Sequence, residues 1–237
     1  MVHLKINSTV VLSIGLFVGG FVFAVTLNER EKQLIDHVIW SIEQAEKGES
    51  KISPAVLAVP GMTSPRVKNF LNNLCTLDQA TYFEIGVWKG ATFTAALFGN
   101  KNSLRQAVAM DNWSEFGGPA EEFKANCSLI ADVPFNFYNH DCFSISKNGL
   151  FDAPVDIYFY DGEHSAHNQE RAFTYYNDLF ASSFIAVIDD WNFGWVPYGT
   201  RQAFNKLGYT ILFERELPGK HDATLWWNGL YVAVIRK

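Results

Sequence analysis

Carboxylate side chains close several short apolar stretches of this sequence, at the positions where buried strands would end. They are Glu84 in "YFEIG", Asp111 in "AVAMD", Asp141 in "NFYNHD", Asp161 in "IYFYD", and Asp189 and Asp190 in "AVIDD". Carboxylates can accept hydrogen bonds from ligand hydroxyls, bind hard cations and move protons. If the fold gathers them, these residues predict a site for a hydroxyl-bearing ligand or a cation.

A repeated alternation of strands and helices would bring these acids together. From residue 80 onward, apolar strand-like segments without polar alternation are separated by helical ones, which indicates strands buried on both faces. The sequence therefore predicts an α/β fold with a doubly wound, mostly parallel sheet, in which ligands bind beyond the carboxyl ends of the strands. Two final strand-like segments, 209–215 and 230–237, have no helix between them and are expected to pair as an antiparallel hairpin.

Gly86 and Gly90 flank the first strand-to-helix turn, where a missing side chain lets a ligand approach the backbone and the free N–H groups of a helix start. A tight turn without a ligand would need the same residues. Their spacing is G-x-x-x-G, whereas dinucleotide sites use G-x-G-x-x-G. The pattern therefore disfavours a nicotinamide-dependent oxidoreductase.

Asp111 ends the next strand-like segment, where an acid in nucleoside-binding α/β folds accepts the hydroxyls of a ribose. Asp141, after the third strand, is placed to approach an adenine amino group. The alternative for Asp111 is a helix-capping role at the start of "NWSEF".

The composition excludes some classes of protein. The 237 residues carry a formal net charge of −6, whereas a nucleic-acid binder needs a basic face. The three cysteines, Cys75, Cys127 and Cys142, form no CxxC pair, so reduced thiols are expected. We expect one globular domain with a short appendage and no nucleic-acid partner.

Residues 1–28 are predicted to be an N-terminal membrane anchor. The stretch 10–27 has no charged residue and would give roughly 27 Å of helix, about the thickness of a hydrocarbon core. A cleaved signal peptide ending near Ala24 and a buried or interfacial segment remain alternatives, and they would make the protein secreted or soluble.

The basic residues around this stretch indicate its orientation. Lys5 precedes it, while Arg30 and Lys32 follow it. Because cytoplasmic flanks are enriched in basic residues, we expect a single-pass protein with its catalytic domain in the cytoplasm.

Two further regions follow the anchor. Residues 29–75 are predicted to be a helical lead-in, with an apolar stripe over 31–48 and a second helix in 63–74 that Ser64 would cap. Residues 76–237 are predicted to be the Rossmann-like domain.

The motifs "EIGVWKGAT", "HD" at 140 and 141, "DGEHS" and "IDDWN", together with Asp111, resemble class I S-adenosylmethionine-dependent methyltransferases. More narrowly, they resemble the macrocin-type sugar O-methyltransferases and related glycan methyltransferases. The resemblance covers roughly residues 60 to 235. The glycine turn alone is generic, and its combination with "DGEH" and "DDW" is more specific.

The resemblance implies how S-adenosylmethionine would bind. Glu84 and Gly86, with Gly90 closing the turn, would border the methionine part. Asp111 would hold the ribose, and Asp141 with its neighbour Cys142 would border the adenine.

The resemblance also implies a divalent metal on Asp161, Asp189 and Asp190. Three carboxylates at neighbouring strand ends repel one another unless a cation or protons intervene, and an all-oxygen set suits Mg²⁺ or a similar ion. The alternative is that Asp189 and Asp190 cap the next turn. Glu163 and His164 are the candidate catalytic bases, and His164 is preferred because it titrates near neutrality.

Together these features predict a metal-assisted O-methyltransferase that acts on a hydroxyl of a sugar or glycan. The alternatives are a methyltransferase with a non-sugar, small-molecule acceptor and a membrane-anchored nucleoside-binding module without catalysis. The last would predict loss of the acids at the strand ends, and the sequence retains them.

Overall fold

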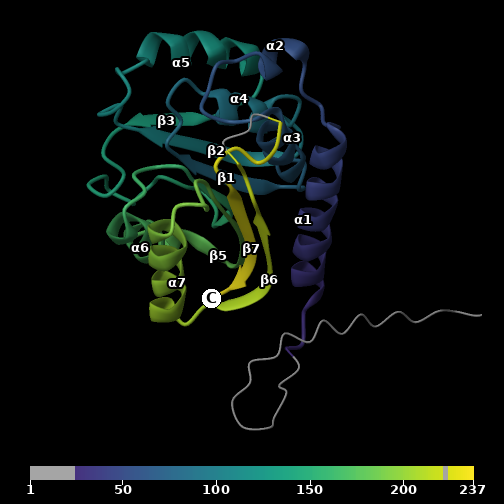
Figure 1. The fold of residues 1–237 in the computed structure, drawn as a ribbon, viewed down its shortest axis with the longest axis vertical. Helices are drawn as coiled ribbons and strands as arrows, with labels where there is room; N and C mark the ends of the chain where they lie inside the picture. The colour runs from purple at the N-terminus through teal and green to yellow at the C-terminus, as the bar shows by residue number, and fades with distance from the viewer. Residues whose placement is uncertain (1–24, 221–223) are drawn as a thin grey trace, which may run out of the picture.

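The computed structural model describes residues 25–220 and 224–237, in which a seven-stranded sheet has helices on both faces (Figure 1). Its strands lie in the order β3-β2-β1-β4-β5-β7-β6. Their bounds are β1 Ala80–Ile85, β2 Leu104–Asp111, β3 Asn136–Asn139, β4 Val155–Tyr160, β5 Phe180–Ile188, β6 Thr210–Leu217 and β7 Leu230–Arg236. Strands β1 to β5 pair in parallel, and β7 pairs antiparallel with both β5 and β6. The predicted doubly wound sheet and its antiparallel C-terminal pair are confirmed, with β6 rather than β7 at the edge.

The helices divide between the two faces of the sheet. They are α1 Glu29–Lys47, α2 Pro54–Leu57, α3 Pro65–Leu74, α4 Ala91–Leu97, α5 Ala120–Cys127, α6 Ala166–Thr174 and α7 Trp195–Leu207, with 3-10 turns at Ser128–Ile130 and Asn177–Leu179. Apolar residues of α1, α3, α4 and α5 share one core with one face, and those of α6 and α7 share a second core with the other. The lead-in helices are therefore packed into the core of the sheet (Figure 1).

Local sequence explains where the lead-in helices begin. The Asn28 side chain accepts a hydrogen bond from the Glu31 N–H, and the Glu31 carboxylate accepts one from the Asn28 N–H, which is a capping box. Ser64 caps α3 as predicted. Between these two lead-in helices the chain forms the short helix α2, because Ser53 caps it and a proline opens it.

A buried ion pair fixes α1 to the amino end of the sheet. The Glu31 carboxylate accepts hydrogen bonds from Arg236 Nε at 2.6 Å and from Ser183 Oγ at 3.0 Å. Its side chain is 1% exposed, and the hydrogen bonds from Arg236 are the main cause that lowers the pKa of Glu31 to about 2. The start of α1 is thus held against β5 and β7.

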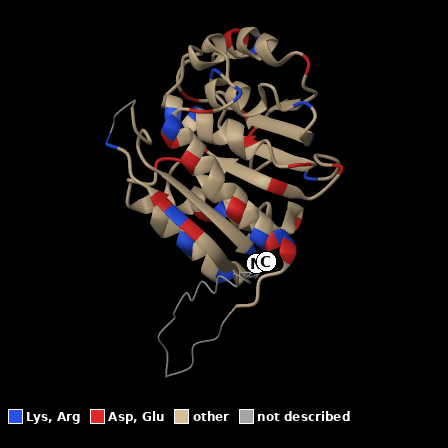
Figure 2. Ribbon diagram, turned by 90° about the vertical axis from the view of Figure 1, so that its right-hand side faces the viewer, with Lys and Arg blue, Asp and Glu red and all other residues tan. Residues whose placement is uncertain are grey.

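The membrane-anchor prediction concerns residues 10–27, most of which lie outside the described residues. Within 25–220 and 224–237, no helix combines the length and apolar character needed to cross a membrane. Figure 2 shows acidic and basic residues interspersed along the helices and strands on the side that it faces.

We predict that Arg236→Met lowers the free energy of unfolding by about 2–3 kcal/mol near neutral pH, because it leaves the Glu31 carboxylate buried without its cation. A carboxylate with a lowered pKa stabilises the fold above its unfolded pKa, and this contribution is lost as the pH falls toward the folded value. The difference between wild type and variant should therefore shrink between about pH 5 and pH 2. Urea unfolding measures it.

Lys32→Met is the matched control, because Lys32 forms an exposed ion pair with Glu29 on the same helix. It should change the unfolding free energy by less than about 0.5 kcal/mol. Equal effects of the two substitutions would contradict the role given to the buried pair.

Candidate functional site

The register of the parallel strands brings four chain segments to one edge of the sheet. Ile85 of β1 pairs with both Met110 and Tyr160, and Tyr160 pairs with Ile188. The next residue of each segment therefore lies at the same level: Asp111 is the last residue of β2, and Gly86, Asp161 and Asp189 directly follow β1, β4 and β5. A cavity of about 720 Å³ opens there.

Nine of the predicted site residues line this cavity. They are Gly86, Asp111, Asp141, Cys142, Asp161, Glu163, His164, Asp189 and Asp190. Glu84 and Gly90 do not line it. The structure thus brings together residues that are up to about a hundred positions apart in the sequence.

Glu84 lies inside β1, beneath the glycine turn. It is 0% exposed and accepts hydrogen bonds from the Tyr82 hydroxyl and from Thr92 Oγ1, each at 2.5 Å. Burial raises the pKa of Glu84 to about 7, against the opposing effect of the two hydroxyl donors. In this structure Glu84 links β1 to α4 and has no face on the cavity.

Both glycines of the turn have left-handed backbones. Gly86 has φ +90°, and a Cβ there would lie 1.8 Å from the Asp161 carbonyl oxygen, so the close approach of β1 and β4 requires glycine. Gly90, with φ +80°, is the N-cap residue of α4. The glycine spacing therefore has a structural reason at both positions.

The Asp111 carboxylate accepts two backbone hydrogen bonds. Its Oδ2 accepts from the Trp88 N–H at 2.8 Å, and its Oδ1 accepts from the Trp113 N–H at 2.7 Å. Each carboxylate oxygen keeps a further lone pair. Asp111 can therefore order the glycine turn and the following loop and still accept hydrogen bonds from a ligand.

Asp141 and Cys142 form the wall beyond β3. Asp141 Oδ1 accepts a hydrogen bond from the Phe143 N–H at 2.9 Å, and the Tyr176 hydroxyl donates to the Cys142 carbonyl oxygen. Burial is the main cause that raises the pKa of the Cys142 thiol to about 12. The thiol is therefore neutral near pH 7 and offers an apolar contact.

Asp161, Asp189 and Asp190 converge with His164 at the ends of β4 and β5. His164 Nε2 lies 3.1 Å from Asp190 Oδ2 and 3.7 Å from Asp161 Oδ1. Burial, followed by the charges of Asp189 and Asp190, holds the pKa of Asp161 well above its usual value, and burial raises that of Asp189 to about 8. Burial and mutual repulsion therefore favour the neutral forms of both carboxyl groups.

The two candidate bases have different surroundings. Burial lowers the pKa of His164, although the charges of Asp190 and Glu163 oppose it, so its imidazole is neutral near pH 7. Burial alone would raise the pKa of Glu163, but hydrogen bonds from Ser165 and Asn168 outweigh burial and lower it. Glu163 is thus a hydrogen-bonded carboxylate, whereas His164 has a neutral imidazole beside Asp190.

The donor chemistry of the three aspartates suits a hard divalent cation. Asp189 Oδ1 is buried and has no hydrogen-bond partner among the described residues. An orphaned carboxylate oxygen beside two other carboxylates is the kind of ligand set that Mg²⁺ accepts. Their present arrangement is not a formed metal site, because the described part of the chain contains no group of three His, Cys, Asp or Glu residues placed to hold a metal ion.

Several residues that line the cavity were not predicted from the sequence, and most of them are aromatic. They include Met62, Trp88, Trp113, Glu115, Phe116 and Trp227. Only Trp88 had a local signal, because it stands between the two glycines of the turn. None of the described residues that line the cavity is lysine or arginine.

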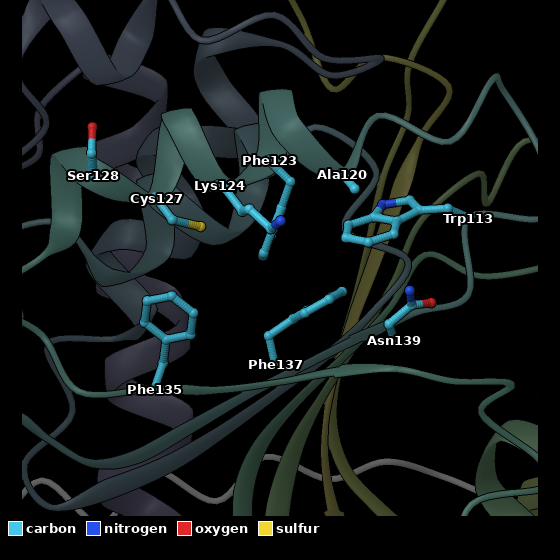
Figure 3. Close-up of a pocket in the computed structure, with 9 residues that line it drawn as sticks. All are labelled: Trp113, Ala120, Phe123, Lys124, Cys127, Ser128, Phe135, Phe137 and Asn139. Atoms are coloured by element: carbon cyan, nitrogen blue, oxygen red, sulfur yellow. The ribbon is translucent and has the colours of Figure 1, made fainter.

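A second cavity of about 600 Å³ lies between α5 and β3 (Figure 3). Phe123 projects into it from α5, and Phe135 and Phe137 line it from the β3 side. Trp113 lines both cavities and lies at one end of the second one in Figure 3. The loop after β2 therefore separates the two spaces.

Comparison with known proteins gives a family for part of the chain. Residues 83–191 match the sequence family described as "Methyltransferase domain". No curated protein matches the chain. The matched segment is similar to that family and runs from within β1 to just past β5.

Solved structures share the fold at low sequence identity. An O-methyltransferase from Bacillus cereus in complex with SAH has a TM-score of 0.50 at 13% identity, with 90% of this chain and 93% of that chain covered. TomG from Streptomyces achromogenes, an O-methyltransferase involved in tomaymycin synthesis and solved with SAM, has a TM-score of 0.50 at 18% identity, with 89% and 100% covered. TrmN from Thermus thermophilus has a TM-score of 0.55 at 13% identity, with 77% of this chain and 51% of that chain covered. This chain thus spans about half the length of TrmN, and it has the Rossmann-like methyltransferase fold.

We predict that Glu84 makes stability fall with rising pH. The fold favours its neutral form, so the unfolded chain releases this proton first, and stability is lost between about pH 4.5 and pH 7. A pKa raised to about 7 corresponds to a loss of about 3 kcal/mol. Glu84→Gln keeps the shape and removes the titration, so its unfolding free energy should be flatter over this range.

Urea unfolding of both proteins at several pH values measures the difference. Glu43→Gln, an exposed carboxyl of α1, is the control and should follow wild type. Parallel pH profiles for wild type and Glu84→Gln would refute the assignment.

Proposed function

We propose that this methyltransferase domain uses S-adenosylmethionine to methylate a hydroxyl group of a neutral small molecule, with a sugar or glycan as the leading acceptor class. The observation that carries the proposal is the cavity itself. Its floor is the Gly86 turn, its side is the Asp111 carboxylate at the end of β2, and both belong to the segment that matches the methyltransferase family. The S-adenosylmethionine- and SAH-bound structures with this fold support the choice of cofactor.

The cofactor would lie across the carboxyl ends of β1 and β2. Its methionine part would pass over Gly86, where no side chain blocks the backbone, and its ribose hydroxyls would donate to the free lone pairs of Asp111. The adenine would lie beside Asp141 and Cys142. Bound there, S-adenosylmethionine supplies an electrophilic methyl group on a sulfonium sulfur.

His164 would act on the acceptor hydroxyl. Asp190 holds its Nε2 at 3.1 Å, so the imidazole has a fixed orientation, and its lowered pKa keeps it neutral and able to take a proton. As the acceptor oxygen gains the methyl group, its proton would pass to Nδ1 of His164, because Nε2 donates its hydrogen to Asp190 and Nδ1 is the acceptor nitrogen of the neutral ring. Asp190 would then stabilise the imidazolium.

A divalent cation would be held by Asp161, Asp189 and Asp190. It would neutralise carboxylates that otherwise repel one another and would lower the pKa of an acceptor hydroxyl. The unpartnered Oδ1 of Asp189 supports this part of the proposal.

The charge of the cavity supports a neutral acceptor. Seven carboxylates and no described lysine or arginine line it, so it offers no cation to a phosphate or carboxylate group. This disfavours an RNA substrate. A neutral non-sugar molecule would suit the same walls, and acceptor assays separate the two classes.

One expectation from the sequence extends this proposal, and another competes with it. A membrane anchor in residues 10–27 would place the domain beside a membrane, with a substrate made or used there. The non-catalytic alternative is less well supported, because the strand-end acids and a neutral His164 are all present in the cavity.

We predict that the purified protein binds SAH with a dissociation constant in the micromolar range, about −8 kcal/mol. Asp111→Asn should weaken this affinity about tenfold or more, because charge-assisted hydrogen bonds to the ribose are lost. Isothermal titration calorimetry measures both. Asp36→Asn, on the exposed side of α1, is the control and should bind as wild type does; no heat of binding with folded wild-type protein would refute the cofactor assignment.

We also predict one Mn²⁺ site in the SAH-bound protein, detected by electron paramagnetic resonance. Asp189→Asn should abolish it while SAH affinity stays unchanged, since Asp189 faces the acceptor end of the cavity. Asp132→Asn, an exposed change elsewhere, should keep the site. Mn²⁺ binding that survives in Asp189→Asn would remove the metal from the proposal.

A further inference from the structure

Left-handed backbone conformations are concentrated around the cavity. Six non-glycine residues in the described ranges have a positive φ, and five of them line this one space. The five are Trp88, Trp113, Phe116, Asp190 and Trp227. Such conformations cost about 1–3 kcal/mol each and persist only where surrounding contacts hold them.

Trp88 occupies the centre of the glycine turn. Its φ is +40°, in the region that favours glycine, yet the chain places its largest side chain there. The indole reaches across to the loop after β2: Nε1 donates to the Phe116 carbonyl oxygen at 3.2 Å. The Trp88 and Phe116 rings meet edge to face, with centroids 6.3 Å apart.

The loop returns a hydrogen bond to the turn. Trp113 Nε1 donates to the Trp88 carbonyl oxygen at 3.0 Å. The Asp111 carboxylate also accepts the backbone N–H of both tryptophans. Four hydrogen bonds therefore connect the glycine turn, Asp111 and the loop of residues 112–118.

The two ends of this loop differ. At its start, the Trp113 ring packs against Phe123 and Phe137, with centroids 5.7 and 4.9 Å apart, in the cavity of Figure 3. At its end, Gly117 and Gly118 are left-handed, and a Cβ would meet no atom within 4 Å at Gly117 and only the Trp113 carbonyl oxygen, at 3.8 Å, at Gly118. The loop thus has a fixed start and an open, glycine-rich end.

The middle of the loop forms a wall of the cavity. Residues 112–116 all line it. Phe116 is nevertheless 64% exposed, so little besides Trp88 holds this end of the wall in place. Phe116 is therefore held in place by its contacts with the Trp88 indole more than by burial of its own side chain.

We propose that Trp88 is a positioning residue whose indole N–H latches residues 112–118 over the bound cofactor and thereby slows cofactor release. The inference rests on the proposed function, since the cofactor must bind beside Asp111. It predicts that loss of the latch increases the dissociation rate while the fold remains intact.

A merely structural role for Trp88 predicts a different result. If the indole served only to stabilise the domain, removing it would lower the melting temperature. Glycine is the residue that best tolerates φ +40°, so Trp88→Gly removes the side chain and relieves the backbone strain together. Under the latch proposal, its melting temperature stays the same or rises.

The experiment measures SAH dissociation by stopped-flow displacement in wild type, Trp88→Phe and Trp88→Gly. Trp88→Phe keeps an aromatic ring near Phe116 but loses the indole N–H and some ring area, so we expect SAH to dissociate at least about fivefold faster, as loss of one hydrogen bond implies. Trp88→Gly should be faster still, by about tenfold or more. Trp40→Phe changes a tryptophan of α1 that stacks on His37 far from the loop in sequence, and it should match wild type.

Chymotrypsin cleavage after Phe116 provides a readout that needs no ligand. We expect Trp88→Gly to be cleaved there faster than wild type, and SAH to protect wild type more than the variant. Unchanged dissociation and cleavage rates in both Trp88 variants would overturn the latch, as would a melting temperature that falls in step with them. Failure of folded wild type to bind SAH would instead overturn the proposed function, while the cleavage comparison still decides whether Trp88 holds the loop.

Discussion

The carboxylate of Asp111 accepts one backbone hydrogen bond from the glycine turn and one from the loop after β2, and the shape of the cavity depends on this pair of bonds. Trp88 and Trp113, the two donors, both have left-handed backbones that a chain rarely adopts with large side chains. A charged acceptor compensates for this strain more strongly than a neutral one. Because Asp111 is the last residue of β2 and pairs with Asn139 of β3, the sheet fixes its position, and Asp111 in turn fixes both walls.

A second constraint acts at the ends of β4 and β5, where parallel pairing forces acids together. Tyr160 pairs with Ile188, so Asp161 and Asp189 must lie side by side, and Asp190 follows. Like charges this close together do not all ionise: burial and the neighbouring charges hold the pKa of Asp161 well above its usual value, and burial lowers the pKa of His164. A bound cation would also offset the repulsion among these carboxylates. The cluster is therefore costly for stability, which is the pattern expected where a site does chemistry.

The sequence predicted the sheet and the strand-end acids of the cavity, because both follow from local patterns. Buried strands without alternation predict parallel pairing, and the residues at the carboxyl ends of parallel strands lie at one edge of the sheet, which is where the structure places Asp111 and Asp161. Glu84 looked equivalent but lies two residues before the turn, still paired within the sheet, so its carboxylate is buried beneath the turn. Trp113 and Phe116 had no local signal, because their role depends on where a glycine-rich loop folds back in space.

We propose that S-adenosylmethionine binds across the ends of β1 and β2, beside the Asp111 carboxylate. A crystal structure of the protein with SAH would show where the cofactor lies. We expect ribose hydroxyls within hydrogen-bond distance of both Asp111 oxygens, the homocysteine over Gly86, and the adenine beside Asp141 and Cys142. SAH bound elsewhere, or a cavity that stays empty at saturating SAH concentration, would refute this placement.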